Sequence, residues 1–86
     1  MNTYTVEITE EDIVTGKHNG YDCPVAKALK KIKLIGPVVG VNSFSYIDLI
    51  TGKVIDIAWN SEKISNFIND FDNQKEVKPF KFMLKI

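Results

Sequence analysis

Apolar and polar residues alternate strictly after Pro79, and this pattern constrains the fold more than any other part of the chain. Phenylalanines and aliphatic residues take every second position, and lysines and a methionine lie between them: Phe80, Phe82, Leu84 and Ile86 against Lys81, Met83 and Lys85. Successive side chains of a strand point to opposite faces, so this period of two indicates a half-buried strand. Tyr4, Val6 and Ile8 repeat the pattern in residues 3–8. The sequence therefore predicts a strand near each end of the chain.

A short helical turn is expected directly after the first strand. Thr9 stands three residues before Asp12, which is a variant of the capping box, and Gly16 supplies a stop. Residues 10–15 should therefore form one turn, with three acids placed at its positive end. These acids could pair for acid–base or metal chemistry, but acids in a first helical turn are more often solvated.

Two longer helices are expected further along the chain. One should begin at Pro24, capped by Asp22 or Cys23, and should end at Gly36-Pro37. The other should begin after Asn60 or Ser61 and end near Asn73. Each has an apolar stripe at helical spacing: Val25, Ala28, Leu29 and Ile32 in the first, and Ile64, Phe67, Ile68 and Phe71 in the second.

Three further strands are predicted between these helices. They cover residues 38–43, 44–50 and 53–59, and Thr51-Gly52 is expected to form a tight hairpin turn. No repeat or linker divides the sequence. The expected fold is a single α+β domain over residues 1–86, with a small, mainly antiparallel sheet of about five strands and two helices packed on one face.

Charge and length limit the functions that the chain can have. Eleven lysines balance eleven acids in 86 residues and there is no arginine, so sequence-specific DNA recognition is not expected. No apolar run is long enough to span a membrane, and neither a membrane partner nor a signal peptide is expected. The lone Cys23 fits a reducing compartment, so a cytoplasmic location is expected. A chain of this size gains stability from association, which favours a homo-oligomer.

Several short motifs resemble a small, uncharacterised family of phage and prophage proteins. They are the run Glu11-Asp12-Ile13, Gly16, the segment Cys23-Pro24-Val25-Ala26 followed by Ala28-Leu29, and the closing residues Ile64, Phe67-Ile68, Phe71-Asp72, Val77, Pro79-Phe80 and Phe82. Some relatives have a second cysteine three residues before Cys23, where this chain has Gly20. The resemblance implies a phage origin, an accessory role and location in the host cytoplasm. It implies no catalytic residue.

Cys23 and His18 are the residues with the most reactive side chains, and neither is expected to act in catalysis. A thiol at a helix N-terminus is activated by the helix dipole, and His18 could serve as its base. A buried or capping cysteine is the more common situation, and one cysteine with one histidine does not fill a zinc site. We therefore expect no enzyme activity, no metal and no cofactor.

Lysines are concentrated around the helix that begins at Pro24, and this segment is the expected ligand site. Lys27, Lys30 and Lys31 fall opposite its apolar stripe, next to a helix N-terminus that can hold an anion. A solvated helix face is the alternative interpretation. Aromatic residues could stack on a nucleobase. The expected ligand-binding residues are Tyr21, Lys27, Lys30, Lys31, Tyr46 and Trp59.

Two functional hypotheses follow. The first is a phage counter-defence protein that binds a small phosphate-containing immune signal, such as a cyclic dinucleotide, and withholds it from the host, with a pocket formed between subunits. The second is a protein-binding inhibitor of a host defence enzyme, which uses the acidic first turn or an exposed sheet edge. An enzyme that acts through Cys23 and His18 is a third, less favoured hypothesis.

Overall fold

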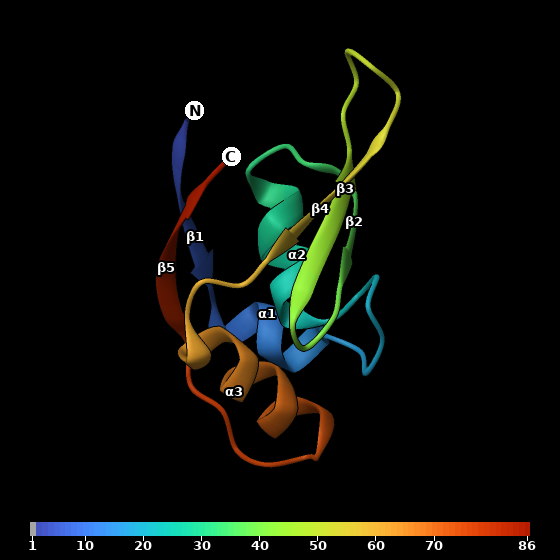
Figure 1. Ribbon diagram of the computed structural model, residues 1–86. Helices are drawn as coiled ribbons and strands as arrows, with labels where there is room; N and C mark the ends of the chain where they lie inside the picture. Colours follow the sequence, from blue (N-terminus) through green and yellow to red (C-terminus); the bar gives the residue numbers. More distant parts are fainter. Residues whose placement is uncertain (1) are drawn as a thin grey trace.

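The computed structural model describes residues 2–86 and contains five strands and three helices (Figure 1). In chain order they are β1 (Thr3–Ile8), α1 (Glu10–Thr15), α2 (Pro24–Lys31), β2 (Ile35–Val39), β3 (Ser43–Ile47), β4 (Val54–Ala58), α3 (Glu62–Asp72) and β5 (Phe80–Lys85). All strand pairs are antiparallel, so the predicted α+β class is confirmed. No helix among residues 2–86 is long and apolar enough to cross a membrane.

The five strands form two sheets instead of the single sheet that we expected. β1 pairs with β5 over its whole length, from Thr3 opposite Lys85 to Ile8 opposite Phe80, so the first and last strands lie side by side (Figure 1). The other sheet has the order β2-β3-β4. Helix α2 packs against both β1 and β2. Because most of its residues are buried, α2 needs cover from more than one side, and it receives this cover from both sheets.

The core is built from the residues that the apolar patterns identified. Val6 and Ile8 of β1, Val25 and Leu29 of α2 and Phe44 of β3 are almost fully enclosed. The α3 stripe closes this core: Ile64, Phe67, Ile68 and Phe71 are all buried. The helix caps agree with the sequence as well, since the side chains of Thr9, Cys23 and Ser61 each accept a backbone N–H at a helix start.

The predicted end of α2 at Gly36-Pro37 is wrong. The helix ends at Lys31, and Lys33 then adopts a left-handed conformation with φ of 72°. Gly36 and Pro37 lie inside β2, where the pairing with β3 is irregular and Gly36 has φ of 59°. The predicted strand at 38–43 is therefore shifted to Ile35–Val39. A bulge and an edge position make glycine and proline compatible with a strand here, because an edge residue need not donate to a neighbour.

The connection between β3 and β4 is wider than the predicted two-residue turn. The strands end at Ile47 and resume at Val54, and the hairpin closes through the Asp48 N–H, which donates to the Lys53 carbonyl at 2.9 Å. Gly52 adopts φ of 72° and donates to the Asp48 carbonyl at 2.7 Å. This hairpin extends beyond the rest of the protein (Figure 1). The molecule as a whole, hairpin included, measures 38 × 21 × 21 Å.

Candidate binding surface

Apolar side chains are exposed at the end of the β3–β4 hairpin. Leu49 is 75% exposed, Ile50 is 95% exposed and Val54 is 69% exposed. Ile35 and Ile47, on the neighbouring strands, are also exposed. We call these five residues the apolar hairpin end. Turns are normally polar because their side chains face water, so a leucine and an isoleucine in this loop require another explanation.

Strand register makes part of this surface continuous. Ile35 lies opposite Ile47 in the β2–β3 pair, and Ile47 lies opposite Val54 in the β3–β4 pair. Directly opposite residues of antiparallel strands share a face, so the three side chains form one row across the sheet. By their exposed fractions the five residues together expose roughly 600 Å² of surface, backbone atoms included, so their apolar share falls within the range of the largest apolar patch on a typical monomer. Patches of this size commonly bind other proteins.

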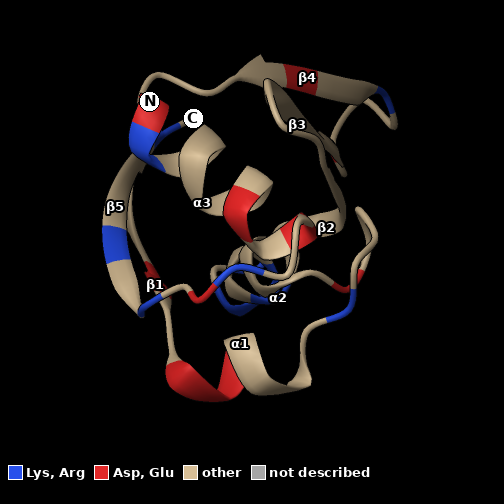
Figure 2. Ribbon diagram, turned by 90° about the horizontal axis from the view of Figure 1, so that it is seen from below, with Lys and Arg blue, Asp and Glu red and all other residues tan. Residues whose placement is uncertain are grey.

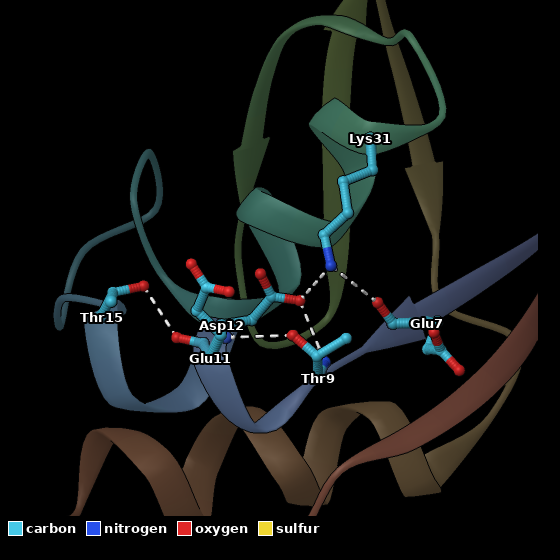
Figure 3. Close-up of polar contacts among 6 residues, drawn as sticks. All are labelled: Glu7, Thr9, Glu11, Asp12, Thr15 and Lys31. Atoms are coloured by element: carbon cyan, nitrogen blue, oxygen red, sulfur yellow. Dashed lines mark hydrogen bonds and ion pairs between the residues drawn. The ribbon is translucent and has the colours of Figure 1, made fainter.

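Lys31, one of the predicted ligand-binding residues, instead connects α2 to β1 and α1. Its Nζ donates to the Asp12 carboxylate at 2.6 Å and to the Glu7 carbonyl at 3.5 Å (Figure 3). Asp12 also accepts the Thr9 backbone N–H, and its own N–H donates to the Thr9 hydroxyl. Burial alone would raise the pKa of Asp12, but the hydrogen bonds from Lys31 and Thr9 outweigh burial and hold this pKa below its ordinary value.

Lys30 is also engaged within the chain, although it stays close to another expected ligand residue. Its Nζ donates to the Tyr21 carbonyl at 2.8 Å and lies 3.6 Å from the Asp22 carboxylate. This contact is with the backbone of Tyr21, and the residue itself is 63% exposed. Lys27 is half-buried on the same helix and forms none of the ion pairs found among residues 2–86. The structure thus brings Tyr21 and Lys30 together.

Tyr46 and Trp59 lie among the core aromatics, away from these lysines in the fold. Trp59 stacks on Phe44 with ring centroids 4.6 Å apart, and its indole N–H donates to the Gly40 carbonyl at 2.9 Å. It also meets Phe82 of β5 edge to face. Tyr46 follows the same side of β3 and packs against the core. Trp59 thereby connects the two sheets, whereas Tyr46 contacts Phe44 on its own strand. Neither ring lines the cavity or the groove described below, and neither does Tyr21.

Cys23 has a structural position. It is buried, and its Sγ accepts the Ala26 N–H at 3.4 Å as the cap of α2. Burial raises the pKa of the thiol, and the charge of Asp72 adds to this rise, while the N–H groups at the start of α2 act in the opposite direction. The thiol is therefore protonated near neutral pH. The His18 ring stacks on Phe71 with centroids 4.6 Å apart, and no hydrogen bond joins it to Cys23 within the described chain.

Two concave regions of the molecule do not fit a large anionic ligand. A partly enclosed cavity next to Cys23 and Phe67 has a volume of about 120 Å³, well below the roughly 300 Å³ at which ligand pockets begin. A wider and more open groove of about 670 Å³ runs between α3 and β5. Three acids and two lysines line it: Glu62, Asp70, Glu76, Lys63 and Lys78. Its acidic excess disfavours phosphate.

Few charges lie along the β3–β4 hairpin: Asp56 within β4, and Asp48 and Lys53 at the two ends of the connecting loop. Figure 2 shows acids over α1 and α3 and basic residues on α2, whereas β3 is uncharged and β4 carries one red band within an otherwise neutral strand. This hairpin surface was not predicted from the sequence. Ile47, Leu49 and Ile50 flank the turn in the sequence, and this unusual apolar content was the available signal. Comparisons with family models, curated proteins and solved structures found no match to the chain.

Proposed function

We propose that this protein acts by binding another protein through the apolar hairpin end. The observation that carries the proposal is the exposure of Leu49, Ile50 and Val54 at the tip of a projecting hairpin. Burying such side chains against a partner removes apolar surface from water, at roughly 25 cal/mol per Å². A small protein without net charge and with this apolar hairpin end is suited to act as an inhibitor that covers part of the surface of a larger protein.

The partner that best fits the resemblance noted above is a host defence enzyme. A phage accessory protein would meet it in the host cytoplasm, where the lone cysteine stays reduced. Inhibition would result from covering a surface of the enzyme and would need no catalytic group on this chain. The acidic turn at α1 is a weaker contact surface, because Asp12 is buried and bonded to Lys31.

Paired substitutions test this proposal. The variant with Leu49→Ser and Ile50→Ser removes the two most exposed apolar side chains of the loop without touching the core, so it should fold normally and lose partner binding. The matched control is Val14→Ser, which removes an exposed apolar side chain from α1, 73% exposed. Immobilised wild-type protein and both variants would be exposed to host lysate, and the captured enzyme would be identified and assayed. Capture that is equal for wild type and the loop variant contradicts the proposal.

The expected homo-oligomer is a separate proposal that concerns the same surface. Two copies that bury their apolar hairpin ends against each other would each cover roughly 600 Å², which is below the roughly 800 Å² per partner of a standard interface. Molar mass measured by light scattering over a range of concentrations tests it. A dimer that dissociates in the Leu49→Ser and Ile50→Ser variant would indicate self-association through this surface.

Sequestration of a cyclic nucleotide signal is the second candidate function, and the proximity of Tyr21 to Lys30 favours it. The exposed Tyr21 residue offers a ring that could stack on a base, and Lys30 offers a positive charge for a phosphate. The test is a thermal-shift series with cyclic dinucleotides, using wild type and a variant with Lys27→Glu and Lys30→Glu. Lys31 is left unchanged because it holds Asp12. A shift that survives both substitutions would remove this site from consideration.

A further inference from the structure

The alternation of hydrogen-bonded and non-hydrogen-bonded residue pairs along the β3–β4 hairpin shows which backbone groups of β4 face away from β3. The Trp59 N–H donates to the Asn42 carbonyl at 3.0 Å, and the Asp48 N–H donates to the Lys53 carbonyl at 2.9 Å. Hydrogen-bonded pairs alternate along an antiparallel ladder, so Ile55 and Ile57 also bond inward to β3. The N–H and C=O groups of the intervening residues, Val54, Asp56 and Ala58, therefore point to the open side of β4.

This open side has no protein partner within residues 2–86. β4 is the last strand of its sheet, and the hydrogen bonds formed outside the regular ladders involve no backbone group of Val54, Asp56 or Ala58. The three residues are exposed. An edge strand with free donors and acceptors is a template for a further strand.

The edges at β2 and β5 are protected against strand addition, and the edge at β1 is engaged at one position. On β2, Pro37 has no N–H to donate, the pairing is irregular, and the Val39 N–H already donates to the Gly20 carbonyl at 2.8 Å. In the first sheet Asn2 and Ile86 are hydrogen-bonded to each other, and the bonded pairs of β1 and β5 alternate from them in the same way. There the outward residues of β5 include Lys81 and Lys85, and on β1 the Glu7 carbonyl receives Lys31. Lysines at an edge oppose pairing.

Asp56 determines which kind of strand fits β4. Its side chain lies on the outer sheet face, opposite Ser45 of β3, and it takes part in no ion pair of the described chain. Pairing of two β4 strands over their full length about a two-fold axis would place Asp56 opposite Asp56. Like charges directly opposite each other destabilise a strand pair, whereas opposite charges stabilise it. The edge thus disfavours a second copy and favours a partner with a cation at this position.

We infer that β4 accepts an extended segment of the partner protein as an additional antiparallel strand, with a lysine or arginine opposite Asp56. The inference rests on the proposed protein-binding function and specifies its mode. The partner residues opposite Ile55 and Ile57 are apolar, because these two half-buried side chains of the inner face would be covered by the new strand. The residue opposite Val54 is apolar too, because it extends the row formed by Ile35, Ile47 and Val54.

A charge exchange tests this mode directly. The probe is the capped peptide Ser-Gly-Thr-Ile-Lys-Ile-Val-Gly-Ser, which places its lysine opposite Asp56 in the antiparallel register, and the control peptide has glutamate in place of lysine. NMR titration of the full-length protein should show roughly fivefold tighter binding of the lysine peptide, as expected for one exposed cross-strand charge pair. In the Asp56→Lys variant the preference should reverse. A preference that is unchanged by this substitution overturns the inference.

Amide exchange locates the added strand and separates the two proposals. Binding of the lysine peptide should slow exchange of the Val54, Asp56 and Ala58 amides, while the outward amides of β5 stay unchanged as an internal control. Unprotected β4 amides overturn the strand addition. Loss of partner capture in the Leu49→Ser and Ile50→Ser variant would still support protein binding in that case. Unaltered capture by that variant would instead contradict the proposed function itself.

Discussion

Asp12 belongs both to the capping box of α1 and to an ion pair with Lys31 of α2. Because of these contacts, we expect the stability of the folded protein to fall at acidic pH. The side chain of Asp12 is 9% exposed and that of Lys31 is 48% exposed, so solvent weakens the pair only from one side. Asp12→Asn should lower the free energy of unfolding at pH 7 by about 1–2 kcal/mol, since it loses the charge and weakens the cap. Chemical denaturation in urea measures this change. Glu11→Gln, an exposed acid of the same turn, is the control.

The lowered pKa of Asp12 determines whether stability rises or falls with pH. The pKa of Asp12 is lower in the folded protein than its ordinary value of 3.8, so the unfolded chain binds the proton more readily. The stabilisation is complete above pH 3.8 and is lost as the pH falls through the lower pKa of the folded state. The difference in unfolding free energy between wild type and Asp12→Asn should therefore shrink below about pH 4. A constant difference from pH 7 to pH 2.5 would show that the ion pair contributes nothing.

The Cys23 thiol should react slowly in the folded protein. Its burial raises its pKa and also blocks access, and the thiolate is the form that attacks an alkylating reagent. Native protein at pH 8 should be alkylated by iodoacetamide at least about tenfold more slowly than the chain in urea. Cys23→Ser keeps a side chain that can cap α2 and should remain folded. Equal rates for native and unfolded protein would mean that the thiol is accessible and reactive.

Single residues could be predicted from the sequence when their neighbours in the chain define their role. The caps at Thr9 and Ser61 are local, and a short motif reveals them. The roles of Lys31 and Trp59 depend on groups far away in sequence, namely Asp12 and the Gly40 carbonyl. Neither partner can be inferred from spacing. The sequence therefore suggested free ligand residues where the fold has structural contacts.

Gly16 allows α1 and α2 to approach each other closely. Its φ of −67° is open to any residue, so its importance is steric and differs from the left-handed stop that helix ends often use. An added Cβ would lie 2.7 Å from both the Asp12 carbonyl oxygen and a Pro24 ring carbon. Gly16→Ala should lower the free energy of unfolding by about 1–3 kcal/mol, because two packed elements must separate.

Gly52→Ala is the control for this prediction, because it adds the same methyl group at a position without close neighbours. Nothing lies within 4 Å of an added Cβ at Gly52, but its φ of 72° is unfavourable for alanine. The cost there should be about 1 kcal/mol, from backbone strain alone. Thermal unfolding of both variants measures the difference. If Gly16→Ala is the less destabilised of the two, close packing between α1 and α2 is not important for stability.

Helices and strands in which apolar residues recur at a regular spacing could be predicted from the sequence. Which strands pair with each other could not. The alternation at both ends gave strands with the correct bounds to within a residue, because one face of each is buried. The segment from Lys31 to Ser43 was assigned wrongly, since Gly36-Pro37 is as compatible with a bulged edge strand as with a helix end. The division into two sheets depends on contacts of α2 that are distant in the sequence.

At the scale of the whole molecule, we expect Asp56 to keep β4 from pairing with the β4 of a second copy, so that its removal should change the state of association. Val54, Asp56 and Ala58 already present free backbone groups and exposed side chains, so a single carboxylate is the chief obstacle to an extended sheet across two copies. Asp56→Val should increase self-association relative to the wild type by roughly tenfold, because repulsion is replaced by an apolar cross-strand contact. Sedimentation velocity at several concentrations measures the change.

Two control variants distinguish edge pairing from a general gain in hydrophobicity. Ser45→Val places the same side chain on the same sheet face, but on the central strand β3, which has no free edge. Equal self-association of Ser45→Val and Asp56→Val would show that apolar surface alone causes it. Combining Asp56→Val with Ala58→Pro removes an outward N–H, and proline on a strand edge blocks pairing. If this combination restores wild-type behaviour, β4 is the edge at which copies meet, and Asp56 is the residue that leaves it available for a partner of opposite charge.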